Sequence, residues 1–413
     1  MSAMTATEVE LHTLRAEATI APPALRLDPG LLGDIKRFGA ADVSACFSCG
    51  NCTAICPSAD NDGTFPRRII RYAQLGMKNA LVASKEVWAC YHCGTCTDSC
   101  PTQADPAGFM AAARRYAIAT YDKTGLARTL ATRPVVGTII AVAIAAFFAL
   151  FMDASRGAES TSRLALFLFI PERLIHETGV VVMSLMALAA LAGVVSMVRG
   201  IAHREGVRFR DVFAGPGALR RSLGALWVAL GIEALGQRRY RNDCGEAAEA
   251  EPLYRRRWLI HALTLWGFLG LFLATILDYG LALIGVKATG TPVPIWYPVR
   301  LLGTVAGAAM VYGATLLIWN RLRRANVTAS QSQFSDWLLL ALVWVTGVTG
   351  FAIEVALYLP HPPTWGYWVF LVHVAVAIEL VLLLPFTKLA HAIYRPVALF
   401  LHALAGTRTA ESN

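Results

Sequence analysis

Two kinds of hydrophobic pattern divide this chain. Residues 1–133 are polar, with short stretches such as 66–76 and 107–121 in which apolar residues recur at helical spacing. Residues 134–400 contain long apolar runs, and residues 401–413 form a tail. We find no stretch of useful length that alternates polar and apolar residues as a strand would. The pattern therefore predicts an all-α protein, with a helical N-terminal domain followed by a bundle of transmembrane helices.

The long apolar runs predict six membrane spans, because a helix needs about 20 apolar residues to cross a bilayer. These spans are 135–152, 176–198, 258–284, 299–319, 337–359 and 366–385. The run at 164–170 is too short to cross and is expected at the membrane interface. Residues 199–257 form a basic connection between the second and third spans, and they include an amphipathic helix at about 220–236.

Composition supports a membrane protein and indicates its orientation. Hydrophobic residues make up 56% of the chain and charged residues only 16%, against about a quarter in soluble proteins. Most arginines and lysines of the membrane part fall in the basic connection, in residues 321–324 and after the sixth span. The positive-inside rule then places the N-terminal domain and the C-terminus in the cytoplasm, at a bacterial inner membrane. The net charge of +9 thus reflects membrane orientation, and we expect no nucleic-acid partner. The N-terminal residues lack the pattern of a signal peptide.

The N-terminal domain contains two copies of one cysteine motif. Residues 46–57 and 90–101 both read C-x2-C-x2-C-x3-C-P. This spacing is typical of bacterial iron–sulfur proteins, in which three cysteines of a run bind one cluster and the fourth binds the other. We therefore predict two [4Fe–4S] clusters, one held by Cys46, Cys49, Cys52 and Cys100 and the other by Cys90, Cys93, Cys96 and Cys56. A zinc site would leave the fourth cysteine of each run unexplained.

Other residues of the polar part have two interpretations each. Gly50 and Gly94 follow the second cysteine of each run, where glycine lets backbone N–H groups approach a cluster or simply forms a turn. A set of arginines is expected to form a solvated face or, alternatively, a docking face for an acidic redox partner: Arg67, Arg68, Arg71, Arg114 and Arg115. Cys244, in the basic connection, is expected to be a free thiol.

Four histidines are candidate haem ligands, because histidine within a membrane helix is costly and usually functional. His373 and His391 are eighteen residues apart, so a continuous sixth helix would place both on one face, about 27 Å apart. The depth of His261 matches that of His391, and the depth of His176 is nearer that of His373. We therefore predict two bis-histidine haem b groups, a cytoplasmic one held by His261 and His391 and an outer one held by His176 and His373. A structural role is the alternative for each histidine.

Three acidic residues of the predicted spans are candidates for proton transfer: Asp278, Glu354 and Glu379. Buried carboxylates beside a redox cofactor can accept protons when a quinol is oxidised. For each residue, pairing with Arg173, Lys287 or a tyrosine hydroxyl is the alternative.

These motifs resemble known redox proteins. Residues 46–121 resemble the C subunit of heterodisulfide reductase, a helical ferredoxin with the same two cysteine runs. Residues 135–400 resemble the cytochrome b of heterodisulfide reductase and, more distantly, the gamma subunit of respiratory nitrate reductase, through the stretches 256–270 and 384–395. The fusion of both parts is similar to the C subunit of the quinone-interacting membrane-bound oxidoreductase.

This sequence differs from the nitrate reductase relatives at one of the ligands expected for the outer haem. The nitrate reductase relatives place two haem-ligand histidines on the helix equivalent to 258–284. Here that helix has only His261, and Leu271 occupies the second position. The outer haem therefore depends on His176 or is absent.

The resemblance implies haem b, menaquinone or ubiquinone as substrate, and cytoplasmic flavoprotein subunits of the heterodisulfide reductase A type. It also implies a link to sulfur metabolism at adenylylsulfate reductase. We therefore expect a subunit of a quinone-linked oxidoreductase complex, which passes electrons between the quinone pool, haem b, two [4Fe–4S] clusters and the flavoprotein. The alternative is an iron–sulfur membrane anchor without haem, which docks a soluble oxidoreductase.

Overall fold

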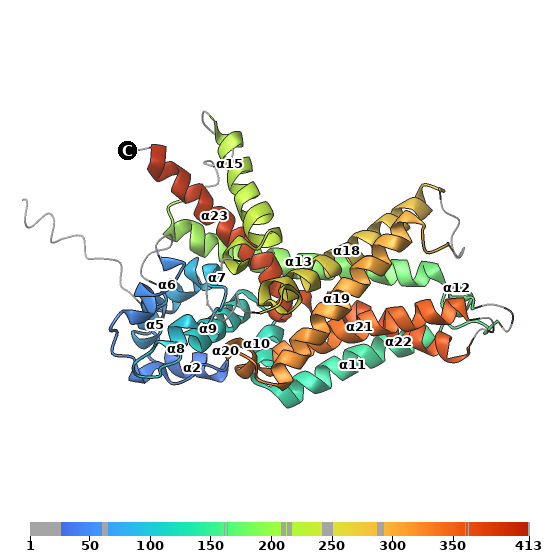
Figure 1. Ribbon diagram of the computed structural model, residues 1–413, viewed down its shortest axis with the longest axis horizontal. Helices are drawn as coiled ribbons and strands as arrows, with labels where there is room; N and C mark the ends of the chain where they lie inside the picture. Colours follow the sequence, from blue (N-terminus) through green and yellow to red (C-terminus); the bar gives the residue numbers. More distant parts are fainter. Residues whose placement is uncertain are drawn as a thin grey trace, which may run out of the picture.

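The fold is helical in every part of the chain that the structure describes. This computed structural model describes residues 26–59, 65–160, 162, 164–207, 212, 217–241, 251–286, 293–359, 361 and 363–411. These residues form helices and no strand, which confirms the predicted all-α class. Figure 1 shows two parts along the long axis of the molecule, namely a group of short N-terminal helices and a set of long helices.

The N-terminal part is built from short helices around α9 (Pro106–Tyr121). Pro106 occupies the first turn of α9, and the Asp105 side chain accepts a hydrogen bond from the backbone N–H of Gly108, so both residues favour a helix start here. Nearly all of α9 is buried, because small alanines let its neighbours pack closely. The other helices are α2 (Leu31–Arg37), η1 (Val43–Ala45), α3 (Asn51–Ala54), α5 (Arg67–Gln74), α6 (Lys78–Val82), α7 (Glu86–Ala89), α8 (Thr95–Asp98) and α10 (Leu126–Thr132).

Six helices in the described part of the chain are long and apolar enough to cross a membrane. They are α11 (Pro134–Asp153), α13 (Glu172–Arg204), α18 (Arg257–Leu283), α19 (Pro298–Leu322), α21 (Phe334–Tyr358) and α22 (Trp365–Leu382). Each overlaps one of the six predicted spans. Large apolar residues on their surfaces are exposed, for example Val142, Leu185 and Leu273, as expected where lipid replaces water. The short run at 164–170 forms only the single turn α12 (Leu166–Phe169).

The chain between His373 and His391 is not one helix, so the prediction that both lie on one continuous helical face was wrong. Helix α22 ends at Leu382 and is followed by two short 3-10 helices, η4 (Leu384–Phe386) and η5 (Lys388–Ala390). Helix α23 (His391–Glu411) then begins at His391 itself. Pro385 explains the break, because proline has no backbone N–H and disfavours helical geometry at the residue before it.

The basic connection contains the amphipathic helix that the sequence predicts. Helix α15 (Ala218–Leu226) continues directly into the π-helix η2 (Trp227–Leu235), followed by α16 (Arg238–Arg241) and η3 (Leu253–Arg255). In Figure 1, α15 rises steeply from the junction between the two parts, beside α23.

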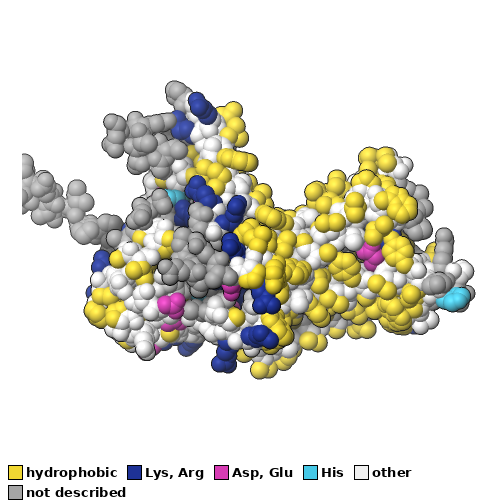
Figure 2. Space-filling view, in the orientation of Figure 1, with side chains coloured by type: hydrophobic (Ala, Val, Ile, Leu, Met, Phe, Trp, Pro, Cys, Tyr) yellow, Lys and Arg dark blue, Asp and Glu magenta, His cyan; other side chains and the backbone are white. Residues whose placement is uncertain are grey.

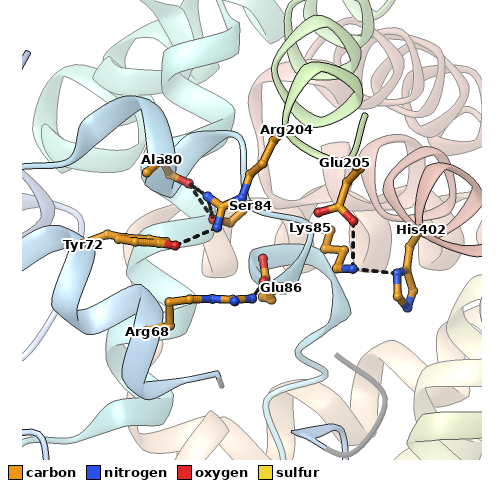
Figure 3. A network of polar contacts seen from close by, with 9 residues as sticks. All are labelled: Arg68, Tyr72, Ala80, Ser84, Lys85, Glu86, Arg204, Glu205 and His402. Carbon is orange, nitrogen blue, oxygen red and sulfur yellow. Dashed lines mark hydrogen bonds and ion pairs between the residues drawn. The ribbon is translucent and has the colours of Figure 1, made fainter. Parts of the chain in front are cut away.

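Polar contacts fix the N-terminal part to the ends of α13 and α23 (Figure 3). The Arg204 guanidinium donates to the carbonyl of Ala80 at 2.6 Å and to the hydroxyl of Tyr72 at 2.7 Å. The Lys85 ammonium lies 2.9 Å from both a Glu205 carboxylate oxygen and His402 Nδ1. Side chains from both parts therefore hold the cysteine loops against one end of the span bundle.

Candidate functional site

The eight motif cysteines line two separate cavities. Cys46, Cys49, Cys52 and Cys100 line one, which we call the first cavity. Cys56, Cys90, Cys93 and Cys96 line the other, which we call the second cavity. Each cavity thus combines three cysteines of one run with the fourth cysteine of the other run. Four thiols around one cavity suit a multi-iron cluster. Among the described residues, no three His, Cys, Asp or Glu side chains lie close enough together to hold a single metal ion.

The two cysteine loops have the same backbone shape. Ser48 and His92, which precede the second cysteine of each run, both have positive φ angles, of 65° and 62°. Gly50 and Gly94, which follow that cysteine, have φ angles of 91° and 101°. Few residues other than glycine adopt such angles without cost. The glycines are therefore required by the loop itself, and each loop leads into a four-residue helix, α3 or α8.

Burial disfavours a free thiolate in the second cavity, so these thiols need a bound cation to become charged. Burial raises the pKa of the Cys56 thiol to about 12, and it also raises the pKa of Cys90 and Cys96. A buried thiol remains protonated unless a cation compensates its charge, and iron does so when it binds the thiolate. The donor set and its surroundings thus fit a cluster.

His261 and His391 face each other next to the second cavity. Their ring centroids are 6.2 Å apart, with 51° between the ring planes. If one nitrogen of each imidazole bound the same metal at about 2 Å, the centroids would be separated by about 6 Å. The two rings come from the second turn of α18 and the first residue of α23. The pair therefore fits bis-histidine ligation of one iron.

Both rings have their other nitrogen engaged. His391 Nδ1 lies 2.5 Å from the Lys388 carbonyl oxygen, and His261 Nδ1 lies 3.2 Å from Oε1 of Gln237. Carbonyl oxygens only accept hydrogen bonds, so each Nδ1 carries the hydrogen and Nε2 is available as a ligand. Sequence reasoning missed Gln237. It is buried and has a positive φ angle of 50°, which is unusual for a residue other than glycine.

Aromatic and cationic side chains join the second cavity to the histidine pair. Tyr91, which lines the cavity, lies with its ring centroid 6.1 Å from that of Tyr240, and Tyr240 lies 5.4 Å from the His261 ring. Arg257, one helical turn before His261, donates to the carbonyls of His92 and Cys93 at 3.2 Å. The second cavity is therefore in contact with the histidine pair through named side chains.

The rings of the second predicted pair, His176 and His373, have different neighbours. His176 instead packs on Tyr279 of α18, with ring centroids 4.3 Å apart. His373 Nδ1 lies 2.9 Å from the hydroxyl of Thr349 on α21. No ring contact joins His176 to His373 among the described residues. The outer haem stays a prediction.

The three candidate carboxylates have different surroundings. Glu354 lies 3.7 Å from Arg300 and within 3.3 Å of the Thr304 hydroxyl. It is therefore paired, although with other residues than the Arg173, Lys287 or tyrosine hydroxyls of the alternative. Asp278, on α18, also has an interaction partner. Glu379 is buried on α22, and one of its carboxylate oxygens has no hydrogen-bond partner in the described part of the chain.

The five arginines expected on one solvated face differ in their exposure in the structure. Arg71 is exposed, as expected. Arg115 is buried, and Arg114 donates hydrogen bonds to the carbonyls of Val87 and Cys90, so the expectation of a solvated face was wrong for these two. Arg115 lies 3.6 Å from the Asp336 carboxylate at the start of α21. Cys244 lies outside the described residues.

The fold and the site define a membrane protein with an iron–sulfur domain. Residues 42–104 match the model of the 4Fe–4S dicluster domain, so the chain carries two 4Fe–4S clusters and functions in electron transfer. Residues 125–412 match the model of citrate utilization protein B, and the chain belongs to this family.

One curated relative gives a more detailed comparison. Citrate utilization protein B of Escherichia coli is 30% identical to this chain over 167 residues. The matched region covers 40% of this chain and 42% of that protein. No solved structure matches this chain.

Proposed function

We propose that this chain is a membrane-bound electron-transfer subunit, which passes electrons between a soluble flavoprotein, two [4Fe–4S] clusters, haem b and the menaquinone or ubiquinone pool. The observation that carries the haem is the pair His261 and His391, with its 6.2 Å centroid separation and both Nδ1 atoms in hydrogen bonds. Haem supplies one-electron chemistry when bound, and these two side chains would hold its iron. The same pair weighs against an anchor without haem.

The order of the centres follows from the contacts of the two cavities. The second cavity touches the histidine pair through Tyr91, Tyr240 and Arg257. The first cavity lies next to solvent, because Cys49 is exposed and the neighbouring Phe47 is 65% exposed. We therefore place the cluster of the first cavity nearest the soluble partner and that of the second cavity nearest the haem.

The side of the membrane follows from the arginine-rich segments. The end of α13 and the start of α18 contact the N-terminal part directly, through Arg204 and Arg257. The start of α21 does so through Asp336. The basic connection and the residues after α19 and α22 therefore lie on the side of the cluster domain. With the positive-inside rule, this supports a cytoplasmic cluster domain at the bacterial inner membrane.

The soluble partner in this proposal is a cytoplasmic flavoprotein, as the resemblance to heterodisulfide reductase implies. That resemblance also suggested sulfur metabolism and adenylylsulfate reductase. The family name instead favours a partner that functions in the utilization of citrate, since the family model covers residues 125–412. We therefore propose that the soluble partner is a flavoprotein acting on a carboxylic acid.

Glu379 is the proton-accepting residue that we propose for quinol chemistry. Its buried carboxylate has an oxygen without a hydrogen-bond partner among the described residues, whereas Glu354 is paired with Arg300 and Thr304. Oxidation of a quinol releases two protons, and a positioned carboxylate can accept one of them.

A reduced-minus-oxidised optical spectrum with a haem and iron count per chain tests this proposal. One haem b and about eight irons per chain would support the pair His261 and His391 with two clusters. Two haems would also implicate His176 and His373. A chain with about eight irons and no haem would overturn the cytochrome and leave the iron–sulfur anchor.

A further inference from the structure

The arm formed by α15 and η2 exposes its large apolar side chains and buries its small ones. The exposed set occupies one helical face: Leu219, Leu223, Leu226, Trp227 and Leu230, with exposed fractions between 41% and 72%. The opposite face consists of the buried alanines Ala218, Ala225 and Ala229, and the arm packs there against α23. A helix that faces water would have the reverse arrangement.

The direction of the arm matches a membrane surface. In Figure 1, α11 and α22 run along the long axis of the molecule, whereas α15 rises away from that axis. It starts at the junction between the N-terminal part and the spans. Figure 2 shows hydrophobic side chains along the edge of this arm that faces the spans. The apolar face of the arm is therefore continuous with the apolar belt of the span bundle.

Arginines flank the apolar face of the arm. Arg220 is exposed beside Leu219, and Arg238 and Arg241 follow at the other end, where the Arg238 side chain is 57% exposed while its guanidinium also lies 3.0 Å from the Glu233 carboxylate. Basic residues beside an apolar helical face are typical of helices that lie in the headgroup region and bind anionic lipids.

We propose that α15 and η2 form an in-plane membrane helix on the side of the cluster domain. Its leucines and Trp227 enter the boundary between headgroups and acyl chains, and its arginines bind anionic phosphates. This inference needs neither haem nor quinone. It has a consequence for the site, because Gln237 lies two residues after the end of η2 and contacts His261. The lipid surface thus supports the segment that positions the histidine pair.

Fluorescent labelling of the full chain in nanodiscs tests this inference. The chain carries Cys244→Ser, which removes the ninth cysteine. The eight motif cysteines are protected by their clusters, so only one introduced cysteine receives the environment-sensitive nitrobenzoxadiazole label. The test position is Leu223→Cys, on the apolar face. The matched control is Gly224→Cys, an exposed neighbour on another side of the helix, where an added Cβ meets no atom within 4 Å.

The nanodiscs contain phosphatidylcholine and phosphatidylglycerol. We expect the label at position 223 to emit at shorter wavelength and to lose most of its intensity with acyl-chain spin-labelled lipids, whereas aqueous iodide quenches the label at position 224. Leu230→Cys repeats the test further along the arm, and iron content per chain reports folding of each variant. Equal quenching by iodide at positions 223, 224 and 230 would overturn the membrane helix and leave the face for a protein partner.

Discussion

Oε1 of Gln237 lies 3.2 Å from Nδ1 of His261, so a residue two positions after the π-helix η2 sets the hydrogen position on a proposed haem ligand. An acceptor on Nδ1 raises the basicity of a ligating histidine, and removing such an acceptor typically weakens metal binding about 10–100-fold. We expect Gln237→Leu to raise the midpoint potential of the haem and Gln237→Glu to lower it. Redox titration of the visible spectrum measures both variants. Midpoint-potential shifts of the same sign in both variants would contradict an electrostatic role of Gln237 and leave only a packing role.

The histidine pair predicts which substitutions remove haem. His391→Ala and His261→Ala should each abolish the haem spectrum, because one imidazole cannot replace the pair that faces the iron. His373→Ala is the matched control, since His373 contacts Thr349 on another pair of helices. Haem quantification per chain distinguishes them. Loss of this haem in the His373 variant with retention in the His391 variant would contradict the assignment.

The two cavities predict that each fourth cysteine affects the cluster of the other run. Cys100→Ser should disturb the cluster of the first cavity, with Cys46, Cys49 and Cys52, and Cys56→Ser that of the second cavity. Loss of one cluster would lower the iron content from about eight to about four per chain. Low-temperature EPR of the reduced protein identifies which signal is lost. If Cys100→Ser removes the same signal as Cys90→Ser, the grouping is wrong.

Tyr240 lies between the second cavity and His261, which predicts a role in the rate of electron transfer between them. Tyr240→Leu removes the ring that contacts both Tyr91 and His261, so reduction of the haem by the reduced clusters should slow. Tyr240→Phe keeps the ring and should retain the rate. Stopped-flow absorbance after reduction of the clusters measures both variants, with the haem spectrum as the control for an intact site. An unchanged rate in Tyr240→Leu would exclude this route.

Close packing of α18 on α19 predicts a stability effect at Gly267. A Cβ added there would lie 2.5 Å from backbone atoms of Ala306 and Met310, and backbone cannot move aside easily. Small residues of this kind let membrane helices approach each other. We expect Gly267→Ala to destabilise the protein by about 1–3 kcal/mol. Gly280→Ala, on the same helix with no atom within 4 Å of an added Cβ, should be neutral. The apparent Tm in detergent measures both, and equal values would contradict the close contact.

The sequence by itself determined the helical class, the six long apolar helices and the two cysteine runs. These properties follow from local patterns, since a span needs about 20 apolar residues in a row and a cysteine run keeps three ligands within one short loop. The amphipathic helix in the basic connection was predictable for the same reason. Gly50 and Gly94 were also visible as special positions, because their backbone angles are a property of the loop itself.

The tertiary structure decided the relationships that have no local pattern. Pro385 breaks the chain after α22, so the helical phase that related His373 to His391 could not hold. The positions of Gln237 and Tyr240 beside His261 depend on how the π-helical arm folds back onto α18 and α23. Arg115 becomes buried only because α9 packs against the start of α21. Contacts between residues far apart in the sequence depend on how the whole chain packs, and a single sequence does not encode that packing in its local spacing.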